Sequence, residues 1–381
     1  MQVPAAQFGT APMNPVERAW RITLDFTGVL RRAESALNTS GDWNPLSPRG
    51  LRQLGEVMFD ELALTGIAAQ ATRQPTLRRS VGSCAAAAEE LPALSIACAH
   101  AEPEPLRVKV IRRRRFGPQE YEQLTFEHHP SLPRSLQAEG LGGPATAVAH
   151  LCRTDDSPRP WLIWVHGANQ GQPLDLLVSR ARRLQNEFGM NIALPVQPGC
   201  GVRRNAWPPY PTMDPLANVA GVMRAVSEVR ALVRWLRPQS TAIAISGVSM
   251  GSPVAALVSH LEQVDAVAVF TPILGINATI AQHLGRWGAS LQNTRELLQS
   301  DAVSDVAKVI DHLSVQPSPP PHRRLIVGAW HDRMAMRETA LALHERWGGQ
   351  LYWHNGSHVG HMLSAGVQKT TEEFLRAVVH H

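Results

Sequence analysis

The sequence predicts an α/β fold in which a mostly parallel sheet has helices on both faces. Three observations lead to this prediction. After residue 160, short apolar runs without polar alternation recur, as they do in strands that are buried on both faces. Amphipathic segments with helical spacing separate these runs, which is the pattern of parallel strands joined by crossover helices. Residues 1–105 differ, because their apolar spacing is helical, and we expect a helical N-terminal extension there.

The N-terminal extension is expected to hold helices over 16–36 and 49–72 and to end near the proline-rich segment 101–106. It contains no recognisable catalytic motif. From residue 106 onward the period changes to that of strands, since apolar and polar residues alternate between turn residues. These first strands are predicted at 106–111, 121–128 and 146–153. The main domain is therefore predicted to run from 106 to 381.

The remaining elements follow the alternating pattern. Buried strands are predicted at 161–167, 191–196, 241–246, 264–272, 323–330 and 350–354. Helices are predicted at 174–189, 216–237, 252–261, 334–348 and 372–379. Segment 271–321 breaks the rhythm, because it is longer than one crossover helix and ends in the proline-rich PSPPPH. We interpret it as an insertion over the carboxyl edge of the sheet, where it would act as a lid.

Composition and charge narrow the function classes. The chain has 381 residues, of which 44% are hydrophobic and 18% charged, as in an ordinary folded protein. Its net charge of +5 comes almost entirely from arginine, and Arg112–Arg115 form the one compact basic run. No nucleic-acid-reading motif accompanies that run, so we interpret it as a solvated face and expect no nucleic-acid partner.

The cysteines and the apolar runs bear on the cellular compartment. The four cysteines are Cys84, Cys98, Cys152 and Cys200. Their spacing fits neither a metal site, a redox motif nor a disulfide framework. The first twenty residues lack the pattern of a signal peptide, and no uninterrupted apolar run reaches the ~20 residues that a membrane span needs. We therefore expect a cytoplasmic protein, and peripheral membrane contact stays open.

The candidate nucleophile lies in GVSMG, residues 247–251. This G-x-S-x-G match falls between a predicted strand and a predicted helix, as a nucleophile elbow requires. Small residues flank Ser249 because the sharp turn brings backbone segments close together. The N-terminus of the following helix also favours developing negative charge. Ser249 is the predicted nucleophile.

A serine hydroxyl needs a base to take its proton, and the base needs an acid to orient it. Asp332 follows the strand predicted at 323–330, and His358 follows the next strand. The chain order Ser249, Asp332, His358 is the order that this elbow architecture uses. His361 remains the alternative base, three residues further from the strand end.

An oxyanion hole requires the N–H after the nucleophile and a second N–H from the loop after an earlier strand. Met250 supplies the first. The loop HGAN at 166–169 follows the strand predicted at 161–167, and we assign the second N–H to Ala168. His166 is expected to be structural within this loop.

On these residues, 106–381 resembles the α/β-hydrolase superfamily. The segments WVHGANQGQPLDL, IALPVQPG, GVSMG and GSHVGH look like a bacterial subgroup related to the α/β-hydrolase domain-containing proteins. The resemblance implies a Ser–His–Asp hydrolase that acts most often on carboxylic esters. It does not extend to the first hundred residues. Ser357 stands where the family motif often has a second glycine, a departure that a turn tolerates.

Several alternatives remain open. His354, His358 and His361 could suggest a metal cluster, but Gly356 and Gly360 disfavour a helix that would align them, and no cofactor or metal is expected. An acyltransferase, a thioesterase or an amidase would use the same triad, and a hydrolase-like binding protein is the non-enzymatic alternative. Apolar residues near the predicted site suggest an apolar acyl pocket for an ester or lipid-like substrate. They are Met250, Ile273, Leu274, Ile276, Trp330 and Trp353.

Overall fold

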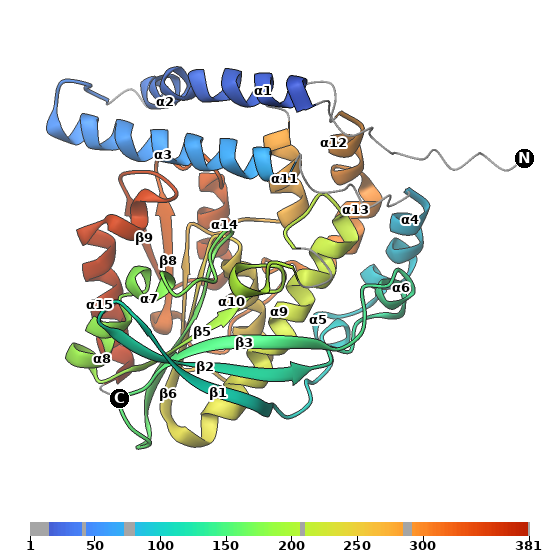
Figure 1. Ribbon diagram of the computed structural model, residues 1–381, viewed down its shortest axis with the longest axis vertical. Coiled ribbons are helices and arrows are strands. Elements are labelled where there is room, and N and C mark those ends of the chain that lie inside the picture. Colours follow the sequence, from blue (N-terminus) through green and yellow to red (C-terminus); the bar gives the residue numbers. More distant parts are fainter. Residues whose placement is uncertain (1–14, 40–42, 72–80, 206–209, 285–291, 380–381) are drawn as a thin grey trace, which may run out of the picture.

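A single nine-stranded sheet forms the centre of the molecule (Figure 1). The computed structural model describes residues 15–39, 43–71, 81–205, 210–284 and 292–379. The strand order across the sheet is β1-β2-β3-β5-β4-β6-β7-β8-β9. The strands are β1 (Arg107–Phe116), β2 (Gln119–His128), β3 (Ala145–Cys152), β4 (Arg159–Val165), β5 (Asn191–Val196), β6 (Ser240–Val248), β7 (Ala266–Phe270), β8 (Arg324–Ala329) and β9 (Gln350–His354).

The direction of the strands divides the sheet into two parts. β1, β2, β3 and β5 pair antiparallel, whereas β5, β4, β6, β7, β8 and β9 pair parallel. The prediction of a mostly parallel sheet is confirmed. Because β6, β8 and β9 run in the same direction, their carboxyl ends meet at one edge of the sheet. Ligands bind at that edge in folds of this kind.

Helices cover both faces of the parallel part. One face carries α7 (Asp175–Val178), α8 (Ala181–Phe188) and α15 (Ala365–Val379), and the other carries α9 (Pro215–Leu236), α10 (Gly251–Leu261) and α14 (Arg337–Trp347). Leu184 and Phe374 belong to the core on the first face, and Val226 and Leu257 belong to the core on the second. Burial on both faces explains why the strand sequences lack polar alternation.

The helix predicted over 174–189 is wrong as one element, because the chain breaks it into α7 and α8. Arg180 adopts a left-handed conformation with φ 57° at the break. Its guanidinium Nη1 donates to Glu372 Oε1 of α15 at 2.9 Å. Because the helical spacing of apolar residues continues through Arg180, the sequence pattern did not indicate a break there.

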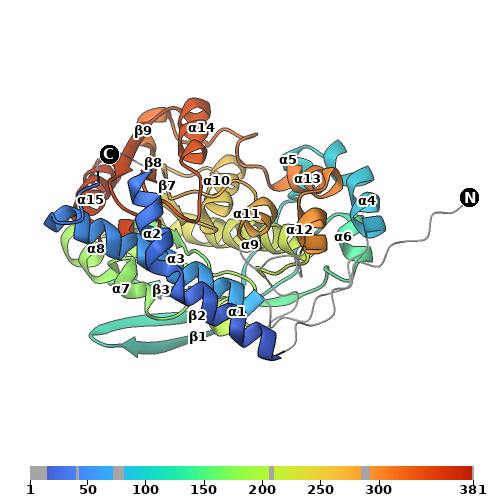
Figure 2. The ribbon, with the colours of Figure 1, turned by 90° about the horizontal axis from the view of Figure 1, so that it is seen from above.

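The predicted helical N-terminal extension is also confirmed. It contains α1 (Pro15–Thr27), α2 (Val29–Asn38), α3 (Pro48–Ala71), α4 (Val81–Glu90) and α5 (Ile96–Ala99); a further short helix, α6 (Arg134–Ala138), precedes β3. Figures 1 and 2 show α1–α3 lying together across the end of the sheet beside the loops that follow β8 and β9. The extension therefore sits over the edge at which the site is expected.

The insertion at 271–321 contains α11 (Ile276–Leu284), α12 (Gln292–Leu298) and α13 (Asp301–Ala307), and its residues 285–291 lie outside the described part. α13 packs against α4, and Val303 and Val306 are buried in the main core with Cys84 and Ala87. The second half of the insertion is thus part of the core. α11 instead approaches the loop after β8, where Nε2 of its His283 lies 3.2 Å from Met334 O.

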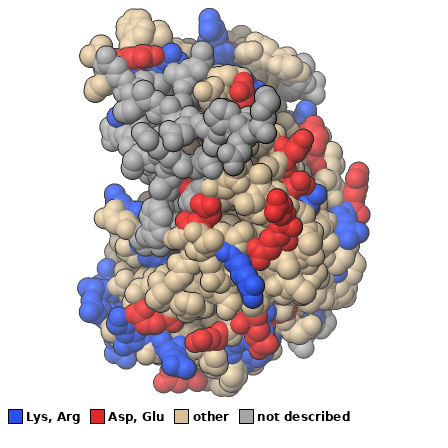
Figure 3. Space-filling view, turned by 90° about the vertical axis from the view of Figure 1, so that its right-hand side faces the viewer, with Lys and Arg blue, Asp and Glu red and all other residues tan. Residues whose placement is uncertain are grey.

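Charge is distributed over the surface without one dominant patch on the face that Figure 3 shows. Basic and acidic side chains are interspersed over the lower part of that face. The basic run predicted to be solvated lies on the edge strand β1, and its members are exposed. Arg113 and Arg115 pair in register with Glu122 and Glu120 of β2.

None of the described helices is long and apolar enough to span a membrane.

Candidate active site

Ser249 occupies a strained turn between β6 and α10. Its φ of 52° is unusual for a residue with a side chain. The turn is held by Ser249 N, which donates to Phe270 O at 2.8 Å, and by Ser252 N, which donates to Ser249 O at 2.9 Å. A side chain at Gly247 would collide with the backbone of Gly251. This is why the motif needs a glycine on the strand side of the serine.

The loop after β4 packs directly against this turn. A Cβ atom at Gly167 would lie 3.3 Å from Ser249 Cβ, and one at Gly251 would collide with Val165 O. Within the described residues, the N–H groups of Ala168 and Met250 have no hydrogen-bond acceptor. Two unpaired donors beside a serine have the chemistry of an oxyanion hole.

His166 is hydrogen-bonded on both ring nitrogens to the backbone of neighbouring loops, as expected for a structural residue. Its Nδ1 lies 2.7 Å from Gly167 O, and its Nε2 accepts from Gln197 N at 3.0 Å. Complete burial lowers the pKa of the imidazole to about 4. A neutral His166 therefore links the loop after β4 to the end of β5.

Asp332 and His358 form a buried acid–base pair. His358 Nδ1 lies 2.8 Å from Asp332 Oδ2, and both side chains are at most 5% exposed. Asp332 Oδ1 also accepts from Met334 N at 2.8 Å and from Ala335 N at 2.7 Å. These two bonds fix the orientation of the carboxylate. α14 begins at Arg337 and not at the predicted residue 334, because Met336 is still extended, with ψ 143°.

The charge of Asp332 favours the protonated form of His358. Burial alone would lower the pKa of His358, but the charge and hydrogen bond of Asp332 outweigh burial and raise it. A hydrogen bond to the carboxylate also selects the tautomer that carries its proton on Nδ1, so Nε2 is left as the acceptor.

Ser249 and His358 are not hydrogen-bonded to one another in the described structure. The connection between their loops runs through Phe270. Its carbonyl accepts from Ser249 N, and its ring stacks on His361 with 5.9 Å between centroids. Catalytic hydrogen bonds are often long or poorly aligned before substrate binds, so the missing bond does not by itself argue against a role for either residue.

The other histidines of this loop have different partners. His361 Nδ1 contacts His358 O, and burial lowers the pKa of His361 to about 4. His354 Nε2 lies 3.1 Å from Glu56 Oε2. No group of three or more His, Cys, Asp or Glu side chains in the described part of the chain is arranged to hold a metal.

Backbone strain is concentrated at this edge of the sheet. Among the described residues, the non-glycine residues with positive φ are Asn169, Arg180, Ser249 and Thr271. Asn169 belongs to the loop after β4, Ser249 follows β6 and Thr271 directly follows β7, so three of the four lie at the carboxyl ends of parallel strands. Strain of this kind persists only where the surrounding structure enforces it, and it is common at active sites.

Sequence reasoning missed the contribution of α3. Asp60 and Glu56 of this helix accept hydrogen bonds from the loop that carries His358, and Asp60 also accepts from Arg333 N in the loop of Asp332. A side chain at Gly356 or Gly360 would collide with the carboxylate of Glu56. The four-residue spacing of Glu56 and Asp60 places both on one helix face, but nothing local in the sequence identifies their partners.

The apolar residues near the site have two different surroundings. Met250, Ile273 and Ile276 are buried in the main core, at 3%, 5% and 5% exposure. Trp330 and Trp353 instead stack on one another, with 4.7 Å between ring centroids. The first three side chains are therefore core residues, whereas the two tryptophans lie at the ends of β8 and β9.

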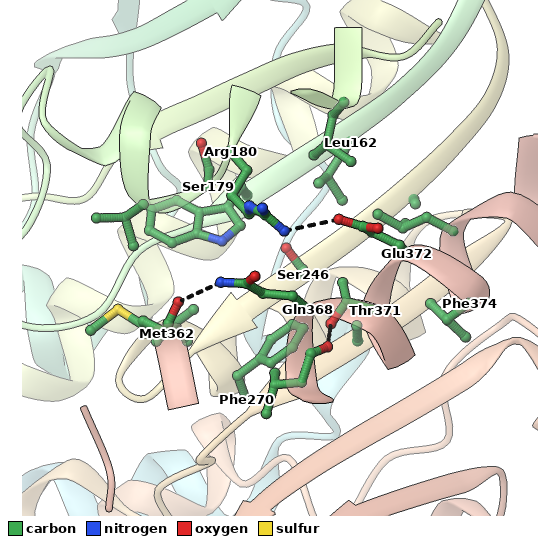
Figure 4. Close-up of a pocket in the computed structure, with 18 of the residues that line it drawn as sticks. Leu162, Ser179, Arg180, Ser246, Phe270, Met362, Gln368, Thr371, Glu372 and Phe374 are labelled. Atoms are coloured by element: carbon green, nitrogen blue, oxygen red, sulfur yellow. Dashed lines mark hydrogen bonds and ion pairs between the residues drawn. The ribbon is translucent and has the colours of Figure 1, made fainter. Parts of the chain in front are cut away.

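Two cavities flank the site. A cavity of about 90 Å³ lies between β6, β7 and α15, and Figure 4 shows the ion pair of Arg180 with Glu372 among its lining residues. Ser246 and Phe270 line it, but Ser249 does not. A wider cleft of about 630 Å³ is lined by residues of the N-terminal extension and of the loop of Asp332. It is lined by Ala36, Thr39, Trp43, Arg49, Gln53, Trp330, His331, Asp332, Arg333, Arg337 and Asn355.

Comparison with known proteins gives sequence relatives and structural neighbours. No family model matches the chain. Uncharacterized protein Rv2627c of Mycobacterium tuberculosis (strain ATCC 25618 / H37Rv) is 31% identical over 289 residues, covering 72% of this chain and 68% of the relative. The acetyl xylan esterase from Paenibacillus sp. R4 superposes with a TM-score of 0.51 at 15% identity, over 78% of this chain and 93% of its own. Acetyl xylan esterase 1 from Thermoanaerobacterium sp. JW/SL YS485 gives 0.50 at 14% identity, over 78% and 92%.

Proposed function

The chain has the α/β-hydrolase fold and belongs to the same family as the uncharacterized protein Rv2627c, and we propose that it is a serine hydrolase of carboxylic esters. The observation that carries the proposal is the buried pair of Asp332 and His358, 2.8 Å apart, at the same sheet edge as the strained Ser249. In this proposal Ser249 is the nucleophile, His358 the base and Asp332 the orienting acid.

The proposed reaction has two halves. Ser249 Oγ attacks the ester carbonyl carbon while its proton passes to Nε2 of His358. The N–H groups of Ala168 and Met250 stabilise the oxyanion, and such donors contribute roughly 10²–10³ each in rate. The carbon–oxygen bond then breaks, and the alcohol leaves with the proton from His358. Water then attacks the acyl carbon and gives a proton to His358. The bond between that carbon and Ser249 Oγ breaks, Oγ takes the proton back from His358, and the carboxylic acid leaves.

Labelling with a fluorophosphonate and turnover of p-nitrophenyl acetate test this proposal together. Ser249→Ala should abolish both, because the covalent intermediate cannot form. Ser252→Ala is the matched control, since Ser252 is a buried serine three residues away whose hydroxyl donates to Gly247 O at 3.1 Å. Wild-type turnover by highly purified Ser249→Ala protein would refute the assignment.

A preference for apolar acyl chains is the finer part of the proposal. Its support is that Met250, which directly follows Ser249, belongs to the same apolar core as Ile273. We further propose that α11 covers the site as a lid, because it contacts the loop of Asp332 through His283. A p-nitrophenyl ester series of increasing chain length tests both, and kcat/KM should rise with chain length. A flat profile would remove the acyl-chain preference and leave the triad assignment intact.

Transfer to an alcohol and hydrolysis of a thioester or amide would use the same acyl-enzyme. Product analysis with an added alcohol separates transfer from hydrolysis, because only a transferase forms the new ester faster than the acid.

A further inference from the structure

Asp60 is a fully buried carboxylate of the N-terminal extension that reaches both loops of the acid–base pair. Its Oδ1 accepts from Ser357 Oγ and from Val359 N, each at 2.9 Å. Its Oδ2 accepts from His358 N at 2.8 Å and from Arg333 N at 3.2 Å. One side chain thus binds the backbone of the catalytic histidine and the backbone of the residue that follows Asp332.

The surroundings of Asp60 do not resemble those of an ordinary packing residue. Its exposed fraction is 0%, and no basic side chain forms an ion pair with it in the described residues. The nearby Arg333 side chain pairs with Glu61, at 2.9 Å. Burying a carboxylate without a cation is unfavourable, so its four hydrogen-bond donors must offset a large desolvation penalty.

Two neighbours extend the same contact. Glu56 lies one turn earlier on α3 and accepts from Ser357 N at 3.2 Å and from His354 Nε2 at 3.1 Å. Glu61 holds the side chain of Arg333 from the next position on α3. The carboxylates of α3 therefore fix the loop of the base and the loop of the acid relative to each other.

We infer that Asp60 is a positioning residue of the active site, through which the N-terminal extension holds His358 against Asp332. The inference rests on the proposed function. A displacement of about 1 Å between reacting groups lowers a rate by roughly 10². The bonds from His358 N and Val359 N to Asp60 restrain that displacement at the base itself. The extension then belongs to the catalytic machinery, although it lies outside the hydrolase domain predicted from sequence.

The charge of Asp60 gives a readout that packing alone would not change. Burial raises its pKa to about 6, the charge of His358 opposes that rise and the charge of Asp332 adds to it. The charge of Asp60 in turn raises the pKa of His358, although the effect of Asp332 is larger. The other two carboxylates of α3 have different partners: Glu56 accepts from the backbone N–H of Ser357, and Glu61 pairs with the Arg333 side chain. Removing the charge of Asp60 should therefore lower the pKa of His358.

The test uses Asp60→Asn in the full chain, because an amide keeps the shape but can no longer accept all four bonds. We expect kcat for p-nitrophenyl acetate to fall about 10- to 100-fold, as for other outer-shell partners, with KM nearly unchanged. The acidic limb of the kcat/KM profile should move to lower pH. Thr65→Val is the control, since the hydroxyl of Thr65, a buried residue of α3, lies 2.7 Å from Asp25 Oδ2 and 3.0 Å from Glu61 O and has no hydrogen bond to either loop among the described residues. It should leave kcat and the pH profile unchanged.

Equal kcat and equal pH profiles in Asp60→Asn and the wild type would overturn the inference, as would an equal loss of kcat in Thr65→Val. If Asp60→Asn does not fold, Ser357→Ala removes one donor to Asp60 and should lower kcat with KM unchanged; a wild-type kcat would again overturn it. Titration of ¹³C-labelled histidine by NMR gives the pKa of His358 without turnover. If the wild type neither turns over esters nor binds fluorophosphonate, the proposed function is refuted. The NMR titration would still decide the role of Asp60, because it compares the pKa of His358 in Asp60→Asn and in the wild type without needing turnover.

Discussion

Asp332→Asn should inactivate the protein while leaving its fold intact, and the geometry of Asp332 explains why. Its Oδ1 accepts from two backbone N–H groups, those of Met334 and Ala335. In the asparagine variant the amide oxygen must take that position, because the NH₂ group cannot accept these bonds. The NH₂ group then takes the position of Oδ2 and faces Nδ1 of His358.

The result is a reversed tautomer. His358 Nδ1 lies 2.8 Å from the Oδ2 position and 3.0 Å from the Oδ1 position. Because the NH₂ group occupies the nearer position, we expect Nδ1 to accept from it and the ring proton to move to Nε2, the atom that should accept the proton of Ser249. A wrong tautomer of this kind lowers kcat by roughly 10⁴ in a serine triad, which corresponds to about 5.4 kcal/mol of transition-state stabilisation. Because the substitution is isosteric and retains the two backbone bonds, the melting temperature should change little.

The assay is p-nitrophenyl acetate turnover with active-site titration, alongside a thermal melt. Asp311→Asn is the matched control, since Asp311 Oδ1 accepts from Leu313 N at 2.9 Å in a similar turn that contains no histidine partner. The control should retain wild-type kcat. A kcat within tenfold of the wild type in Asp332→Asn would show that the tautomer argument is wrong and that Asp332 is not the orienting acid.

Two further predictions concern the base and the N-terminal helix. His358→Ala should lower kcat by roughly 10³ or more. His361→Ala should have a far smaller effect, because the imidazole of His361 contacts His358 O and the ring of Phe270. Steady-state kinetics of the two variants give the ranking, and the reverse order would assign the role of base to His361. For Glu56, burial would raise the pKa, but the hydrogen bonds from His354 and Arg52 lower it to about 2 from 4.5. Its contribution to stability is therefore present above pH 4.5 and is lost as the pH falls through about 2. Allowing for solvent screening, we expect about 1–2 kcal/mol. The difference in unfolding free energy between the wild type and Glu56→Gln, measured in urea, should shrink from pH 7 to pH 3, and a difference that is constant with pH would contradict the assignment.

The parts of the fold that could be predicted are those whose cause is local. The elbow at Ser249 and the strand ends before Asp332 and His358 follow from apolar runs that stop at polar residues. Parallel strands bring their carboxyl ends to one edge, which is how distant residues could be assigned to one site. The break at Arg180 could not be predicted, because its partner Glu372 lies on another helix.

The contribution of α3 was beyond sequence reasoning for the same physical reason. Glu56 and Asp60 lie on an amphipathic helix, where acidic residues are usually solvated. Their burial depends on Ser357 and His358, which belong to a loop that is far away along the chain. Only the tertiary arrangement shows that these carboxylates are buried.

The distance along the chain between α3 and the loop of His358 has a consequence for the order of assembly. The bond from Ser357 to Asp60 joins residues 297 positions apart. Ribosomes deliver the N-terminal segment first, and contacts across such separations form late because loop closure opposes them. On a nascent chain, Glu56 and Asp60 therefore face water as ordinary solubilising charges. The contact between α3 and this loop can form only after Ser357 and His358 have been synthesised.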